Sequence, residues 1–180
     1  MKEKFLQSAR EYIVLIGTSL LMVFLVRTFI AQPFVVSGAS MEPTFYTNQY
    51  LIVDQLTYEL SEPKRGEVII FRYPLIPSRF FIKRVIALPG ETIKITNNKV
   101  EIKEVGSDTF TTLEEEYVEF PKESYVETTL AEDEYFVMGD NRMASLDSRS
   151  WGPLKESFIV GRAFVRLFPL SKIDIFPGSY

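Results

Sequence analysis

A long apolar segment near the N-terminus is the feature that most constrains how this chain folds. Residues 12–30, YIVLIGTSLLMVFLVRTFI, carry a single charge, at Arg27. A segment of this length and hydropathy is typical of a membrane-spanning helix. After Arg27 the next basic residue is Lys64, whereas three basic residues precede the segment, namely Lys2, Lys4 and Arg10. This asymmetry favours an N-terminus in the cytoplasm and a chain that continues on the outer face.

Two other interpretations of this segment compete with an anchor. The uncharged core, Ile13 to Val26, also has the length of the apolar part of a cleaved leader, but RTFIAQPF after it lacks the small residues of a cleavage site. A buried helix of a soluble domain would show a polar stripe, which this segment lacks. We therefore expect a single, uncleaved transmembrane helix.

The rest of the chain is expected to be mainly β. Short runs of β-branched and aromatic residues alternate with turn residues, as in antiparallel strands, at residues 50–56, 67–73, 80–88, 134–140 and 160–170. Asn97-Asn98 between TIKIT and KVEIK predicts a tight hairpin, because Asn tolerates positive φ. Pro89-Gly90 predicts a further turn.

An acidic, Thr-rich stretch interrupts this pattern between about Lys103 and Glu134. Its Glu114-Glu115-Glu116 run is expected to be a solvated surface, and no spacing of oxygen ligands indicates a calcium site. The expected organisation is a tail and anchor at 1–31, a catalytic core at 32–102 plus 131–176, and a small inserted subdomain at 103–130.

Composition excludes several classes of function. The formal net charge of −4 argues against nucleic acid as a partner, since binding to phosphates requires a basic face. The chain has no Cys and no His, so it has no disulfide, thiolate nucleophile, imidazole metal ligand or Ser-His-Asp triad. We expect neither a metal nor a cofactor. Proton transfer must use Lys, Asp, Glu or Tyr.

Ser40, in SGASMEPTF, is a candidate nucleophile that requires a nearby base. With histidine absent, the best candidate is a lysine whose pKa is lowered by burial. Lys83 lies in RFFIKRVIALPG, where strand alternation places it on one face with Phe81 and Val85. The alternative interpretation is an edge-strand lysine that prevents aggregation.

Three segments in order, SGASMEPT, FIKRVIALPGE and GDNRMASLDSRSWGPL, resemble the type I signal peptidase family. Members are membrane-bound serine proteases with a Ser–Lys dyad, and the match runs from the anchor to about Phe168. The resemblance implies that Ser40 is the nucleophile and Lys83 the general base, in a coiled antiparallel β-sheet domain with a small inserted β subdomain.

The resemblance also implies supporting residues. Ser145 matches a serine that holds the lysine ammonium, and the other matches are an ion pair, Asp147 with Arg149, and two further supporting residues, Asp140 and Arg84. The Ser40 N–H is expected to form part of the oxyanion hole. Some members carry a hydroxyl two residues before the nucleophile as a second oxyanion-hole donor, and Gly38 occupies that position here. The candidates for the second donor are Ser37, a backbone N–H or a bound water.

The implied substrate is a preprotein with small residues at the first and third positions before the cut. The residues expected near the pockets for these side chains are Phe34, Val36, Met41 and Ile82. Membrane lipid is an expected partner and the secretion translocon a candidate one. The expected location is the bacterial cytoplasmic membrane, single-pass, with the catalytic domain on the outer face.

Two alternative functions belong to other classes. A self-cleaving Ser–Lys repressor-type protease resembles this fold, but a membrane helix stands where a DNA-binding domain is expected. A non-catalytic, membrane-anchored β module would tolerate loss of Ser40 or Lys83, and both are present.

Overall fold

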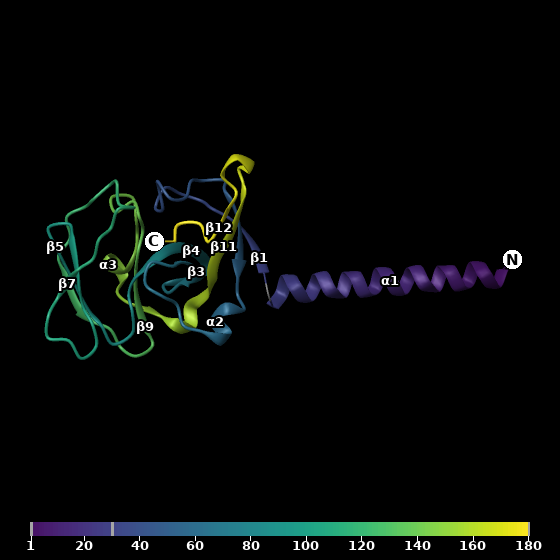
Figure 1. The fold of residues 1–180 in the computed structure, drawn as a ribbon, viewed down its shortest axis with the longest axis horizontal. Coiled ribbons are helices and arrows are strands. Elements are labelled where there is room, and N and C mark those ends of the chain that lie inside the picture. The colour runs from purple at the N-terminus through teal and green to yellow at the C-terminus, as the bar shows by residue number, and fades with distance from the viewer. Residues whose placement is uncertain (1, 30, 180) are drawn as a thin grey trace.

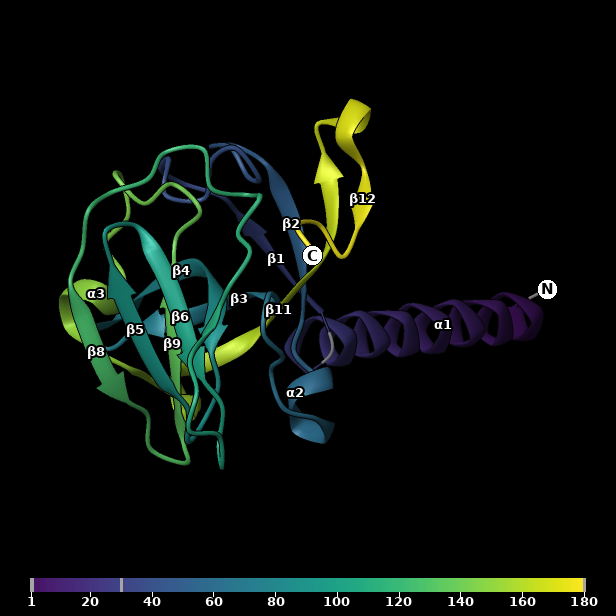
Figure 2. The ribbon, with the colours of Figure 1, turned by 60° about the vertical axis from the view of Figure 1, so that its left-hand side comes forward.

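The computed structural model describes the backbone of residues 2–29 and 31–179, and side chains over 10–27 and 31–179. One long helix, α1 (Lys2–Phe29), projects from a body made of β-strands (Figures 1 and 2). Within the described residues, none of the helices is both long and apolar enough to qualify as a membrane span. The side chains of Lys2 and Lys4, and residue Ile30, used in the sequence analysis, lie outside the described part.

The body confirms the mainly β, antiparallel prediction. Its larger sheet has the order β1 (Ala31–Val35), β2 (Tyr50–Asp54), β11 (Ile159–Phe168), β3 (Val68–Tyr73), β4 (Ile76–Ala87), β9 (Glu134–Met138) and β10 (Leu154–Lys155), with β12 (Asp174–Ile175) paired to β11. The short helical elements are α2 (Thr57–Leu60), α3 (Ser148–Trp151), η1 (Glu156–Phe158) and η2 (Leu170–Lys172). All five predicted strands are present, and β4 begins earlier than expected.

A second sheet has the order β7 (Thr111–Thr112), β6 (Lys99–Lys103), β5 (Thr92–Thr96) and β8 (Val126–Thr129). The predicted β5–β6 hairpin is confirmed, with Asn97 at φ 49° and Asn98 at φ 66°. The hairpin was expected in the catalytic core. It lies instead in the sheet of the insertion, because β5 pairs along its other edge with β8.

One hydrophobic cluster joins the two sheets. Ile86 of β4 and Phe136 and Met138 of β9 pack with apolar residues from the smaller sheet, namely Ile93, Ile95, Val100 and Ile102. A second cluster lies under the segment that carries Ser40, and consists of Val36, Met41, Phe45, Leu51, Val53, Val68, Ile70 and Ala163. The smaller sheet is therefore packed firmly behind β4 and β9, the strands that lead to the site.

Candidate active site

Ser40 lies in a turn between β1 and β2 that is fixed from both sides. Met41 and Phe45 are fully buried and connected by a hydrogen bond from the Phe45 N–H to the Met41 carbonyl, at 2.8 Å. The Val36 N–H donates to the Gln49 carbonyl at 2.9 Å, closing the base of the loop. The buried side chains anchor the turn in the core, so the position of Ser40 is set by hydrophobic packing.

Lys83 lies on β4 and reaches Ser40 directly. Its Nζ donates to the Ser40 Oγ at 2.7 Å and to the Ile82 carbonyl at 2.8 Å. Only 3% of Lys83 is exposed, and its Nζ lies 5.4 Å from the centre of the Phe81 ring, in accord with the predicted shared face. This burial contradicts the alternative of an exposed edge-strand lysine.

Burial lowers the pKa of Lys83 from its ordinary value to about 8. The low-dielectric surroundings disfavour the ammonium, and the positive charge of Arg149 acts in the same direction. The carboxylates of Asp147 and Asp140 oppose this effect. A substantial fraction of Lys83 is therefore neutral near pH 8, the form that can accept a proton from a serine hydroxyl.

Arg84, the next residue on β4, pairs with Asp140 after β9. The Arg84 Nε and a terminal nitrogen donate to the two carboxylate oxygens at 2.9 and 2.6 Å, and both side chains are fully buried. Arg84 also donates to the carbonyls of Gly66 and Gly178, and Asp140 accepts from the Thr44 hydroxyl at 2.5 Å. The pair thus connects β4, the end of β9 and the Ser40 turn.

The ion pair implied between Asp147 and Arg149 is present. Arg149 donates to both Asp147 oxygens at 2.8 Å, and the Gly139 N–H donates to the same carboxylate at 3.1 Å. Burial alone would raise the pKa of Asp147, but the hydrogen bonds and positive charge of Arg149 hold it below its ordinary value. Asp147 therefore stays ionised near Lys83.

Gly139 brings the chain after β9 against the Ser40 turn. A Cβ on Gly139 would overlap the Ser40 carbonyl oxygen and the Ser145 side chain. The adjoining Asn141 N–H donates to that same Ser40 carbonyl at 3.1 Å. Only glycine permits this close approach.

The Ser145 hydroxyl was expected to bind the Lys83 ammonium, but no hydrogen bond joins the two in the described structure. Within the described part of the chain its Oγ is buried and makes no hydrogen bond of ordinary geometry, although it lies near the Asp147 carboxylate. Lys83 instead directs its second hydrogen bond to the Ile82 carbonyl. The hydrogen bond expected between Ser145 and Lys83 is therefore not formed in the described structure, where the Ser145 hydroxyl lies beside Asp147.

A cleft of about 440 Å³ opens at the Ser40–Lys83 pair. Three of the predicted pocket residues, Phe34, Val36 and Ile82, line it together with Ser37 and Gly38. Met41 does not line it. Its side chain is fully buried in the core cluster, because the turn points it inward. Sequence reasoning missed further lining residues, namely Arg79, Phe80, Phe81, Ala144 and Leu146.

Sequence reasoning also missed the role of Glu115. It was expected on a solvated surface, but its carboxylate pairs with Arg142 at 2.6 Å, and their side chains are 10% and 5% exposed. The one available signal was GDNR, which contains Arg142 beside residues already singled out. In the described residues, no three acidic side chains converge as a metal site would require.

Comparison with known proteins identifies the family. Residues 9–168 match the family described as signal peptidase, peptidase S26. The chain belongs to this family. It is 36% identical to signal peptidase I from Leptolyngbya laminosa, over 94% of this chain and 86% of that protein. It is 34% identical to signal peptidase I P from Bacillus subtilis subsp. natto, over 91% of each chain.

A crystal structure of a signal peptidase I from Enterococcus faecalis V583 is 28% identical, with a TM-score of 0.48, covering 57% of this chain and 97% of that chain. The resemblance seen in the sequence motifs is confirmed by the family match, and the chain is a serine peptidase of the signal peptidase family.

Proposed function

We propose that this signal peptidase family member removes N-terminal signal peptides from translocated preproteins, with Ser40 as nucleophile and Lys83 as general base. The observation that carries the proposal is the 2.7 Å contact between the Lys83 Nζ and the Ser40 Oγ. It lies in an open cleft, at a lysine whose pKa is lowered to about 8. A nucleophile and a base within hydrogen-bond reach are the requirement for covalent catalysis by serine.

The proposed reaction has two halves. Neutral Lys83 takes the proton of Ser40 as its Oγ attacks the scissile carbonyl, and the resulting ammonium then protonates the leaving amine. In the second half neutral Lys83 takes a proton from a water that attacks the acyl carbonyl, and the ammonium returns a proton to the Ser40 Oγ as the ester bond breaks. The Ser40 N–H is proposed as one oxyanion donor, with Ser37, at the cleft wall, as a candidate for the second.

The supporting residues act on Lys83 and the Ser40 turn without touching substrate. Asp147 with Arg149 sets the charge around Lys83, and Arg84 with Asp140 fixes the position of β4. Ser145 has a buried hydroxyl available to accept a hydrogen bond from the Lys83 ammonium when it forms.

The cleft suits an extended chain with small side chains near the cut. Among the described strands, β1 pairs with β2 alone, and β9 pairs with β4 from Arg84 onward. One backbone edge of β1 and one edge of the first part of β4 are thus left open to a peptide strand by the rest of the described chain. Phe34, Val36 and Ile82 narrow the space beside Ser40. This arrangement supports selection of small residues at the first and third positions before the cut.

We propose further that α1 anchors the protein in the bacterial cytoplasmic membrane. Its 28 residues extend about 42 Å at 1.5 Å per residue, and apolar side chains from Tyr12 to Val26 are exposed. The terminal charge of Arg27 is able to snorkel to the interface. The basic residues before the segment favour a cytoplasmic N-terminus, which leaves the catalytic domain on the outer face.

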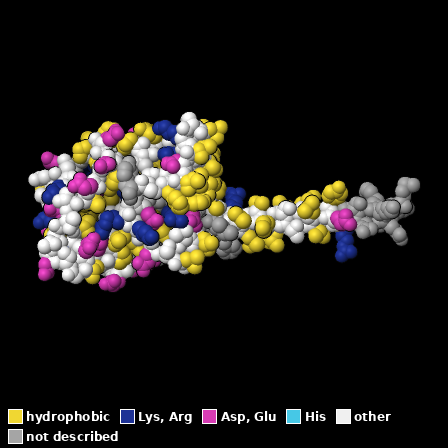
Figure 3. Space-filling view, in the orientation of Figure 1, with side chains coloured by type: hydrophobic (Ala, Val, Ile, Leu, Met, Phe, Trp, Pro, Cys, Tyr) yellow, Lys and Arg dark blue, Asp and Glu magenta, His cyan; other side chains and the backbone are white. Residues whose placement is uncertain are grey.

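The tip of the β11–β12 hairpin supports contact of the body with lipid. Leu170 is 75% exposed and Ile175 63%, with Leu167, Phe168 and Ile173 beside them. Apolar side chains gather on the side of the body from which α1 emerges (Figure 3). Preproteins held in the membrane, delivered by the translocon, would reach the cleft on this side. After extraction with carbonate at high pH, which removes proteins bound only at the membrane surface, the full chain should stay in the membrane fraction and a variant lacking residues 1–31 should not. Release of the full chain, or retention of the shortened variant, would refute the anchor.

The proposed organisation keeps residues 1–31 as tail and anchor, and 32–102 plus 131–176 as the catalytic core, with the exception of the β5–β6 hairpin. The insertion at 103–130 is proposed to form one small subdomain together with the β5–β6 hairpin, whose strands share its sheet.

The deciding experiment is cleavage, in detergent, of a preprotein with an Ala-x-Ala site by wild type, Ser40→Ala and Lys83→Ala. Cleavage at that site by wild type alone supports the assignment of both residues. Cleavage by Ser40→Ala would refute the nucleophile, and absence of cleavage by folded wild type would refute the proposed activity.

A further inference from the structure

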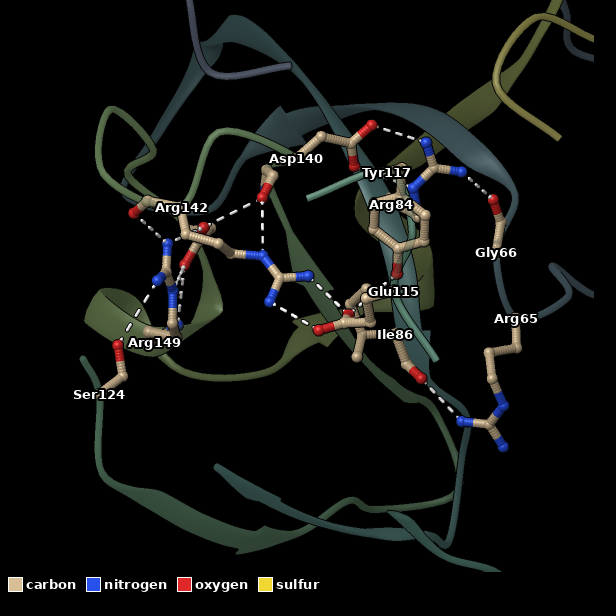
Figure 4. Close-up of polar contacts among 12 residues, drawn as sticks. Arg65, Gly66, Arg84, Ile86, Glu115, Tyr117, Ser124, Asp140, Arg142 and Arg149 are labelled. Carbon is tan, nitrogen blue, oxygen red and sulfur yellow. Dashed lines mark hydrogen bonds and ion pairs between the residues drawn. The ribbon is translucent and has the colours of Figure 1, made fainter. Parts of the chain in front are cut away.

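A largely buried ion pair joins Glu115 of the insertion to Arg142, in the turn at residues 139–142 that follows β9. Both Glu115 oxygens accept hydrogen bonds from the Arg142 guanidinium, at 2.9 and 2.6 Å (Figure 4). Its neighbours Glu114 and Glu116 are exposed. Within this acidic run, Glu115 is therefore the residue whose side chain is withdrawn from solvent and paired with an arginine.

Arg142 in turn holds the segment that contacts both Ser40 and Asp147. The Arg142 Nε donates to the Gly139 carbonyl at 3.0 Å. The Arg142 carbonyl accepts from Arg149 at 2.9 Å (Figure 4). The Gly139 N–H binds Asp147, while the Asn141 N–H binds the Ser40 carbonyl. The Arg142 side chain and backbone thus hold the 139–142 turn, and the backbone of the same turn binds Asp147 and Ser40.

The turn has little room to move without moving the dyad. A Cβ on Gly139 would already overlap the Ser40 carbonyl, so the two backbones are in close contact. Asp147 and Arg149, held by the same turn, both act on the charge of Lys83. A displacement of the turn would therefore shift the backbone of Ser40 and change the electrostatic surroundings of Lys83.

Tyr117 gives the insertion a second contact with the same region. Its hydroxyl donates to Glu115 at 2.9 Å, and its ring lies 4.0 Å from the guanidinium carbon of Arg84. Arg84 is the partner of Asp140, within the turn. Glu115 and Tyr117 thus contact the two arginines that fix this turn, from one short segment of the insertion.

We propose that Glu115 is a positioning residue for catalysis, acting through Arg142 on the turn that places Ser40 and Lys83. The proposal rests on the proposed Ser40–Lys83 reaction and assigns the insertion a part in it. Glu115 is not a catalytic residue, because it contacts Arg142 and Tyr117 rather than the reacting atoms.

The test compares Glu115→Gln with Glu114→Gln and Glu116→Gln, which remove the same charge from exposed neighbours. On a preprotein with an Ala-x-Ala site, we expect kcat of Glu115→Gln to fall about tenfold with KM within about twofold, because small misplacements of reacting groups slow chemistry more than binding. Both controls should match wild type. Circular dichroism and thermal unfolding establish that each variant is folded at the assay temperature.

A wild-type kcat in folded Glu115→Gln, or an equal loss in the two controls, would overturn the inference. Absence of cleavage by wild type itself would instead count against the proposed function. If Glu115→Gln does not fold, Glu115→Asp takes its place. This variant keeps the charge but retracts it by one methylene group, and the same fall in kcat is expected, with wild-type kcat as the contrary result.

A double variant tests the route through Arg142. If Glu115 acts by holding Arg142, Glu115→Gln combined with Arg142→Lys should be no slower than the slower single variant, since partners in one network are not additive. Losses in kcat that multiply would show two independent effects and contradict the proposed route.

Discussion

The Lys83 Nζ lies 2.7 Å from the Ser40 Oγ, in a lysine that is 3% exposed. The two residues are separated by 43 positions and are brought together by the Ser40 turn and the start of the β4–β9 pairing. This single contact places the proposed base next to the proposed nucleophile in a chain without histidine. Burial of Lys83 costs stability at neutral pH, and it favours the neutral amine that the proposed reaction requires.

Replacement of Lys83 by Arg should nearly abolish activity although the positive charge is kept. Arg does not deprotonate in a protein and is therefore unable to act as a base. We expect kcat/KM to fall by about 10²–10⁴, the usual contribution of a general base. Lys122→Arg, at an exposed position, is the control. Turnover by Lys83→Arg close to wild type would remove Lys83 from this role.

Lys83→Met should make the protein more stable while inactivating it. The folded-state pKa of about 8 lies below the ordinary value of 10.5, so at pH 7 folding must bury a charge that the unfolded chain keeps in water. This difference corresponds to on the order of 3 kcal/mol. The gain should be present below pH 8 and decrease as pH rises towards 10.5.

Urea unfolding of Lys83→Met at pH 7 measures this effect, with Lys155→Met as the exposed control. A free energy of unfolding equal to that of wild type would show that burial of the Lys83 ammonium does not destabilise the folded protein.

Asp140→Asn should destabilise the protein strongly, because it leaves Arg84 buried and charged without its carboxylate. Loss of one partner of a buried ion pair costs about 3–5 kcal/mol. Asp133→Asn breaks an ion pair whose side chains are 56% exposed, and should cost less than about 1 kcal/mol. Equal midpoints for the two variants in urea would contradict this account of the Arg84–Asp140 pair.

Gly139→Ala should lower kcat/KM by about 100-fold, since the added methyl group displaces the Ser40 carbonyl or the Ser145 side chain. Gly17→Ala is the matched control, because, apart from its chain neighbours and the local helix backbone, no described atom lies within 4 Å of the added Cβ. The assay is cleavage of the same preprotein at a temperature where both variants are folded. Normal activity of Gly139→Ala would mean that the turn can shift without consequence.

Local patterns predicted much of the fold and the apolar face of Lys83, whereas the Ser40–Lys83 dyad was assigned by the resemblance to the family. Alternation around Lys83 placed its side chain on an apolar face, and Asn97-Asn98 marked the hairpin turn, because both signals depend on neighbouring residues alone. The Arg84–Asp140 and Glu115–Arg142 pairs join residues 56 and 27 positions apart, so they depend on sheet pairing that no local pattern records.

Two other expectations needed three-dimensional information. Met41 was expected at the cleft, but the direction of a side chain in an irregular turn follows from packing against Phe45 and the core. The β5–β6 hairpin was expected in the catalytic core. It belongs to the smaller sheet because β8 pairs with the free edge of β5, and this pairing joins residues distant in the sequence.

The most direct test of the account is the dependence of kcat/KM on pH between 6 and 10. With Lys83 as base, kcat/KM should rise about tenfold per pH unit below pH 8 and level off above it, because the neutral amine is the active form. No histidine or cysteine is present to produce a similar transition. A rate that stays constant from pH 6 to pH 9 would contradict the assignment of Lys83 as the general base.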